Sequence, residues 1–197
     1  MTTAEDASLT TDGGGRRATL VRGAVAGLGA WMLGYLVTYV SKSQAISEAL
    51  RGIGFVSQLL GGETIPAWKG VSWLFLNAHV VATKFPTITG GTQTANFVTG
   101  EEGSALLLAL PVVVLLAAGV VTAYGRPGGA VERAKVGATV ALGYLPLSAG
   151  VALVATHSVG DTDAAIAADP VTAILLAGAV YPLVLGALGG ALSSVAE

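Results

Sequence analysis

Four long apolar stretches constrain this chain more than any other feature of its sequence. They cover residues 18–40, 104–124, 136–156 and 170–192, and none of them contains an acidic residue. Their one basic residue is Arg22, near the start of the first stretch, where a long side chain can reach the membrane–water interface. A helix needs about 20 apolar residues to cross a bilayer. The sequence therefore predicts an all-α integral membrane protein with four transmembrane helices in a single domain, residues 18–193.

Composition points to the same class and excludes several kinds of site. Hydrophobic residues make up 53% of the chain and charged residues 11%, with a mean hydropathy of +0.72. Soluble domains carry about 25% charged residues. The chain has no cysteine, so disulfides and cysteine-based chemistry are excluded. The apolar stretches offer no carboxylate to complete a histidine metal site, and the net charge of −2 gives no support for nucleic-acid binding. We expect no metal, cofactor or nucleic-acid partner.

Basic residues in the short loops predict the orientation of the chain. Five of them flank the first and third stretches: Arg16, Arg17, Arg126, Arg133 and Lys135. The segment 157–169 instead has no base and three aspartates. Because Lys and Arg accumulate in cytoplasmic loops, we expect a multi-pass protein of the cell membrane with both termini in the cytoplasm. The polar residues 1–17 are expected to form a disordered cytoplasmic tail.

The segment between the first two spans is predicted to lie outside and to be partly helical over residues 44–83. Apolar residues at helical spacing predict an amphipathic helix up to about residue 60. After the break "GGETIP", a second helix is expected from residue 67 to about 83. Its apolar part, "WLFLNAHVV" and its neighbours, has only ~13 apolar positions and is too short to cross. It lies flat on the outer leaflet or dips inward as a re-entrant helix, and the sequence leaves both open.

The second outer helix carries the most distinctive polar residues of the chain. Asn77 and His79 lie in its apolar part, with Ser72 and Trp73 one to two turns earlier. One interpretation is a polar pocket at the outer mouth of the helix bundle. The other is a helix anchor, because buried polar groups need hydrogen-bond partners for stability alone. The anchor is the favoured interpretation.

Small residues predict close helix packing. Gly23 and Gly27 form a GxxxG pattern in the first span, which Gly34 continues, and Gly186 and Gly190 form another in the fourth. Such faces let two helix backbones approach closely, either within one chain or between copies. Pro111, Pro146 and Pro182 lie inside three spans, where each removes a backbone hydrogen bond and predicts a kink.

Three segments carry a resemblance to a known group of proteins: "WKGVSWLFLNAHVV", "GYLPLSAG" and "LLAGAVYPLVLGALGGAL". With them the chain resembles a family of small haloarchaeal integral membrane proteins of unknown function, some of them loosely labelled as transporters. The resemblance covers most of residues 18–193. It implies a membrane protein and carries over no active site.

Three functions remain compatible with the sequence. The first is a non-enzymatic membrane protein that assembles with itself or with a membrane partner, which the GxxxG faces and the lack of ionisable groups favour. The second is a small transporter or channel with an outer polar mouth near Asn77 and His79. An enzyme is disfavoured, because no carboxylate pair and no nucleophile–base spacing is visible.

Overall fold

Helices make up most of the structure, a computed structural model that describes residues 4–59, 61–87, 91–99, 105–160 and 164–195. The helices are α1 (Ala4–Leu59), α2 (Ala67–Asn77), α3 (Ala105–Ala123), α4 (Ala130–Ala138), α5 (Ala141–Val154), α6 (Pro170–Thr172), the π-helix η1 (Ala173–Val180) and α7 (Tyr181–Leu192). Within these described ranges, four helical segments are long and apolar enough to cross a membrane: Gly14–Leu59, Leu106–Ala123, Ala130–Val154 and Pro170–Leu192. They correspond to the four predicted spans.

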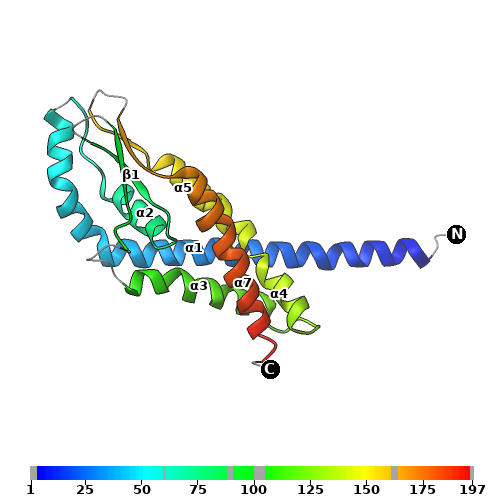
Figure 1. Ribbon diagram of the computed structural model, residues 1–197. Helices are drawn as coiled ribbons and strands as arrows, with labels where there is room; N and C mark the ends of the chain where they lie inside the picture. Colours follow the sequence, from blue (N-terminus) through cyan, green and yellow to red (C-terminus); the bar gives the residue numbers. More distant parts are fainter. Residues whose placement is uncertain (1–3, 60, 88–90, 100–104, 161–163, 196–197) are drawn as a thin grey trace.

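The first helix is much longer than the sequence predicts. It stays helical into the region expected to form a separate amphipathic helix, because the connecting residues "SKSQ" include no glycine or proline that would end it. Its last part nevertheless turns away from the long straight part of the helix (Figure 1). Its N-terminal part is helical from Ala4 onward, whereas residues 1–17 were expected to be disordered. A helix is extended at little cost once it is nucleated. This part projects beyond the rest of the molecule (Figure 1).

The third and fourth spans are each interrupted. The third consists of α4 and α5, which meet at Thr139 and Val140, and it begins six residues before the predicted start at residue 136. The fourth passes through α6, η1 and α7, with Pro182 in the first turn of α7. Proline cannot donate a backbone hydrogen bond, which fits its place at the junction of two helix types.

The prediction of an all-α fold is wrong in one respect. Four short strands form an antiparallel sheet in the order β2-β1-β4-β3: β1 (Thr83–Pro86), β2 (Thr92–Ala95), β3 (His157–Ser158) and β4 (Ala165–Ala168). Thr83 pairs with Ala95 on one side and with Ala168 on the other. The sheet therefore joins the segment before α3 to the segment before α6, both of which were expected to be irregular. Its strands have two to four residues, too few for a recognisable alternating pattern.

The short helix α2 lies at the centre of the packing. Every residue from Gly70 to Asn77 is buried. Trp73 and Leu76 join a cluster with α5, β4 and η1, Phe75 joins a second cluster with α1, α3 and α5, and Leu74 packs against α3. An 11-residue helix is about 16 Å long, about half the hydrocarbon thickness. Thus α2 is short and is enclosed by its neighbours.

The elements divide between two ends of the molecule (Figure 1). The sheet, α2 and the last part of α1 gather at one end, while the end of α3, the start of α4 and the C-terminus lie at the other. The described residues of the segments 61–99 and 157–168 thus lie at the same end of the molecule. The loop 124–129 and the C-terminus share the opposite side.

Candidate functional site

A histidine–tyrosine pair lies in the buried interior beside α2. His79 is fully buried, and its Nδ1 lies 2.9 Å from the carbonyl oxygen of Phe75 while its Nε2 lies 2.8 Å from the hydroxyl of Tyr144. Because a carbonyl can only accept, Nδ1 carries the proton and donates, so in the neutral ring Nε2 accepts from Tyr144. The imidazole also packs against the rings of Phe75 and Tyr181, with centroids 5.0 and 5.2 Å away. The pair thus joins α2 to α5 and to the start of α7.

Burial sets the charge state of this histidine. The loss of solvent lowers the pKa of His79 to about 4, against a smaller opposing effect of the Phe75 carbonyl. The imidazole is therefore neutral at pH 7, in agreement with the hydrogen bonds that it makes. A neutral, fully bonded imidazole in the interior is a well-satisfied structural group.

The residue after His79 has an unusual backbone. Val80 has a φ of +62°, the left-handed region that favours glycine and that β-branched residues rarely adopt. The N–H of Val81 donates to the carbonyl of Leu76, five residues earlier, which is the closing bond of a Schellman C-cap. Val80 occupies the position that glycine usually takes. This turn ends α2 and directs the chain from the buried His79 into β1.

Asn77 ties the end of α2 to two other segments. Its amide nitrogen donates to the carbonyl of Val81 at 2.7 Å and to the hydroxyl of Thr83 at 3.0 Å. Its side-chain oxygen accepts from the N–H of Phe97 at 3.0 Å, and its backbone carbonyl accepts from the side chain of Asn96. The side chain is fully buried, so these bonds take the place of water.

The first turns of α2 bind the end of α5. The indole N–H of Trp73 donates to the carbonyl of Ala155 at 3.0 Å, and the ammonium of Lys69 donates to the carbonyl of Thr156 at 2.6 Å. Carbonyls at a helix C-terminus lack partners within the helix, and these two side chains supply them. Ser72 donates to the carbonyl of Trp68, within its own helix.

The four residues predicted to form a pocket or a helix anchor are enclosed by other parts of the chain. Asn77, His79, Ser72 and Trp73 are all buried, and each hydrogen-bonding atom of the Asn77 and His79 side chains has a partner within the chain. Asn77 and His79 contact different neighbours. Their hydrogen bonds connect α2 and the turn after it to β1, α5 and the segment around Phe97.

The predicted glycine faces meet partners within the same chain. A Cβ added to Gly23 would lie 1.9 Å from the hydroxyl oxygen of Thr139, and one on Gly27 would lie 2.0 Å from the carbonyl oxygen of Val140. In α7, Gly186 faces the carbonyl of Gly137 and Gly190 that of Arg133. Gly34 lies against the ring of Phe75. These faces are occupied by α4, α5 and α2, and so they are not free for a second copy.

The three prolines differ in their surroundings. Pro111 and Pro146 lie inside α3 and α5, while Pro182 follows the π-helix η1. A π-helix is rare and often marks a functional position. Here it ends at Tyr181, whose ring contacts His79. The irregular part of the fourth span thus adjoins the histidine–tyrosine pair.

The five bases that predicted orientation have different roles in the structure. Arg133 is buried and donates to the carbonyls of Ser193 and Gly128. Arg16, Arg17 and Lys135 are exposed and Arg126 is half-buried, and three of these four, Arg16, Arg126 and Lys135, lie around one groove. Arg22 donates to the carbonyls of Val121 and Tyr124 at the end of α3.

Sequence reasoning missed three residues at the end of the molecule that holds the sheet, namely Lys84, Asp169 and Asn96. Lys84 and Asp169 form an ion pair at 2.5 Å between β1 and the start of α6. The hydrogen bond with Lys84, followed by those from Thr172, lowers the pKa of Asp169 to about 2. Asn96 completes the bonding around Asn77. The short segments that carry these residues gave no sequence pattern, because their pairing joins distant parts of the chain.

Comparison with known proteins places the chain in a single group. Its residues 1–197 match the model of a family described as a family of unknown function, DUF7978. No curated protein and no solved structure matches the chain.

Proposed function

Because the chain belongs to DUF7978, a family of unknown function, we propose its role from its own structure: a non-enzymatic, multi-pass protein of the cell membrane that assembles with a membrane partner. The four long apolar helices support the membrane location. Arg16, Arg126 and Lys135 line one groove beside the loop after α3, which supports a cytoplasmic position for that loop and for both termini.

The length of α1 carries the proposal of assembly. Its 56 residues correspond to about 84 Å, far more than the roughly 30 Å of a hydrocarbon core. Beyond the predicted span at residues 18–40 it exposes an apolar group that we call the outer patch: Ile53, Phe55, Val56 and Leu59. Phe55 is 61% exposed and Leu59 is 70% exposed. Large exposed apolar side chains outside a lipid-facing region are typical of protein interaction sites.

The interior of the molecule supports the same role. The glycine faces and the polar side chains of α2 are committed to contacts within the chain. The polar residues that were candidates for a chemical role thus stabilise the fold. This favours a binding role for the protein over a catalytic one. An assembly contact would have to use another surface, and the outer patch is available.

Photocrosslinking tests this assembly. A photoreactive phenylalanine analogue in place of Phe55 is nearly isosteric, and we expect it to give a discrete protein adduct in intact membranes. The matched control places the same analogue at Tyr124, which is 55% exposed at the opposite end of the molecule. Mass spectrometry of the adduct distinguishes a second copy from another protein. Only lipid adducts at Phe55, together with a monomer in detergent, would refute the proposal.

A small transporter is the second candidate, and the histidine–tyrosine pair favours it. An imidazole buried among apolar helices is uncommon, and here it adjoins the π-helix η1. Flux into proteoliposomes containing His79→Ala or Asn77→Ala tests this role. Flux in the native protein that is lost in both variants, at normal protein yield, would favour transport. The same flux in all three proteins would remove these residues from any transport mechanism.

A further inference from the structure

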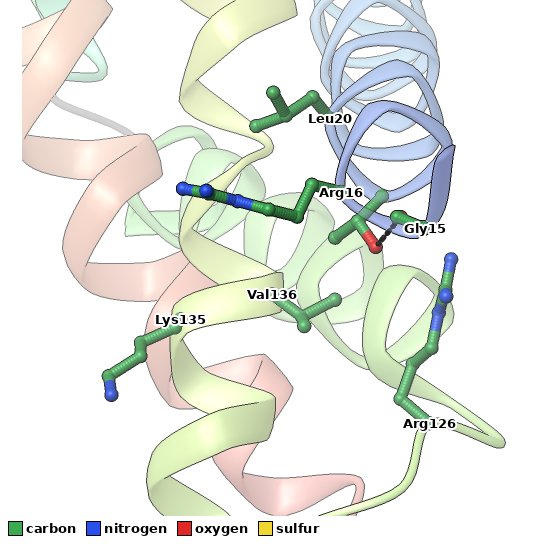
Figure 2. Close-up of a pocket in the computed structure, with 7 residues that line it drawn as sticks. Gly15, Arg16, Leu20, Arg126, Lys135 and Val136 are labelled. Atoms are coloured by element: carbon green, nitrogen blue, oxygen red, sulfur yellow. Dashed lines mark hydrogen bonds between the residues drawn. The ribbon is translucent and has the colours of Figure 1, made fainter. Parts of the chain in front are cut away.

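A groove at the C-terminal end of the molecule is lined by cations from three separate elements. It has a volume of about 420 Å³ and lies between the N-terminal part of α1, the loop after α3, and α4. Arg16 comes from α1, Arg126 from the loop and Lys135 from α4. In Figure 2 the side chains of Arg16 and Lys135 extend to one side of Val136, and Arg126 stands on the other side. No carboxylate is among the lining residues.

The side chains of these three cations lack partners among the described residues, in contrast to those of Arg22 and Arg133. Arg22 and Arg133 donate to main-chain carbonyls. Within the part of the chain that the structure describes, no ion pair or side-chain hydrogen bond engages Arg16, Arg126 or Lys135. The Nε of Arg126 is buried and has no hydrogen-bond partner. A buried donor without a partner is costly, so a ligand that supplies an acceptor there would be stabilised.

The wall of the groove is apolar and leads towards the lipid-facing surface. Leu20 and Val136 line it beside the cations. Leu20 is 49% exposed, and the exposed side chains of Val21, Val25 and Leu28 continue along α1. The cations can bind the anionic headgroup of an amphiphile, and the apolar surface beside them can contact its hydrocarbon chain. Positive charge at this end also follows from the orientation rule alone, but that rule does not require cations around a shared groove.

We propose that this groove binds a phosphate group, and that the phosphate belongs to the headgroup of an anionic phospholipid whose acyl chain follows the exposed face of α1. Arginine and lysine are the usual partners of phosphate oxygens in proteins. Separated cations on a rim suit a headgroup with several anionic oxygens. This binding does not depend on the assembly role proposed above.

Native mass spectrometry of the full chain in an uncharged detergent tests the site. We expect one phosphatidylglycerol to bind more tightly than phosphatidylcholine, which carries a phosphate but no net charge. Arg126→Gln and Lys135→Gln should each weaken phosphatidylglycerol binding about tenfold, the effect of losing one charged contact. Arg126→Lys keeps the charge and should retain most of the binding. Equal binding of both lipids to the native chain would overturn the proposal.

Arg17→Gln is the matched control, because Arg17 is exposed on the same helix as Arg16 but does not line the groove. We expect its binding to stay within twofold of the native chain. A loss equal to that of Arg126→Gln would show a general effect of surface charge and would also overturn the site. Inorganic pyrophosphate distinguishes the sources: competition with phosphatidylglycerol supports a headgroup contact, and pyrophosphate binding without lipid binding assigns the phosphate to a soluble compound.

Discussion

At the scale of single residues, Val80 combines an unfavourable backbone with an important position. Its left-handed conformation costs an L-residue about 1–2 kcal/mol. The turn that requires this conformation places His79 on one side, in the interior, and Val81 on the other, at the entry to β1. The surrounding hydrogen bonds of Asn77 hold the turn in place. Such strain persists where the rest of the structure determines the conformation.

Replacement of Val80 by glycine should stabilise the protein. Glycine adopts this φ without strain, and the half-exposed side chain of Val80 loses little burial. Glycine loses more conformational entropy on folding than valine, which offsets part of the relieved strain. We expect the free energy of unfolding to rise by about 0.5–1 kcal/mol, with a higher melting temperature in detergent. Val81→Gly is the control: Val81 is fully buried, and its loss should destabilise by about 2 kcal/mol. A lower melting temperature for Val80→Gly would contradict this account.

The buried His79 should make stability depend on pH. Burial lowers the pKa of His79 to about 4 in the folded state, while the unfolded value is 6.5. Between these values the unfolded chain binds more protons than the folded one. The contribution of the neutral His79 to the free energy of unfolding is complete above pH 6.5. It is lost as the pH falls towards 4, which lowers the free energy of unfolding by roughly 3 kcal/mol in total.

Unfolding measured between pH 7 and pH 4 checks this dependence. His79→Gln cannot titrate and should flatten the curve over that range. Burial also lowers the pKa of His157, the other histidine of the chain, so His157→Gln is a suitable comparison. His157 is less deeply enclosed, and its replacement should leave most of the pH dependence intact. If the two variants behave alike, the assignment to His79 fails.

At the scale of helices and strands, close backbone contacts at glycine hold the bundle together. Gly27 of α1 faces the carbonyl of Val140 so closely that a methyl group would lie 2.0 Å from its oxygen. Gly143 approaches α1 in return, at the carbonyl of Ala24. Both contacts lie near the junction of α4 and α5. The first and third spans therefore meet through their main chains.

An added methyl group at this contact should be strongly destabilising. We expect Gly27→Ala to lower the free energy of unfolding by about 2 kcal/mol or more, because the helices must separate. Gly29→Ala, two residues away on α1, adds a methyl group that meets nothing within 4 Å. It should be neutral or slightly stabilising, since alanine favours helix. Thermal unfolding of both variants in the same detergent gives the comparison, and equal melting temperatures would contradict the packing described here.

The sequence pattern predicted some helices and strands more accurately than others. The apolar stretches located the second and fourth spans to within about two residues, because about 20 consecutive apolar residues form a strong signal. The same signal did not reveal η1, since α- and π-helices bury similar side chains. The strand Ala165–Ala168 reads "AIAA", which has weak strand preference, and its formation depends on pairing with Thr83 and Lys84.

The candidate site was predicted by residue type but not by partner. Asn77 and His79 were recognised because amide and imidazole groups are unusual in an apolar segment. Their partners Tyr144 and Phe97 lie 65 and 20 residues away in the chain. No local pattern encodes such contacts. The glycine faces were likewise visible, but whether they met helices of the same chain or of another copy depended on the tertiary fold.

At the scale of the whole molecule, the two ends differ in structure and in charge. One end has the sheet, α2 and the ion pair between Lys84 and Asp169. The other has the short loop between α3 and α4, with Arg16, Arg126 and Lys135 around the groove beside it. In Figure 1 these groups lie at opposite ends of the bundle. If the four helices cross a membrane, the two ends are exposed on different sides.

Cysteine labelling tests this topology cleanly, because the native chain has no cysteine. Thr92→Cys and Ala130→Cys replace exposed residues at the two ends. We expect a membrane-impermeant maleimide to label Thr92→Cys in intact cells and to label Ala130→Cys only after the membrane is opened. Labelling of Ala130→Cys from outside would reverse the proposed orientation, and labelling of both would exclude the four-span arrangement.

The sheet order β2-β1-β4-β3 has a consequence for biosynthesis. Strand β1 is complete by residue 86, but its partner β4 begins at residue 165, after three of the four spans. The carbonyls that receive Trp73 and Lys69, at residues 155 and 156, also emerge late. While the ribosome translates the residues between β1 and β4, α2 has α1 beside it but lacks α5 and β4. Its apolar side chains then depend on the translocon, the lipid or a chaperone, and this interval is the stage at which the nascent chain is most exposed to quality control.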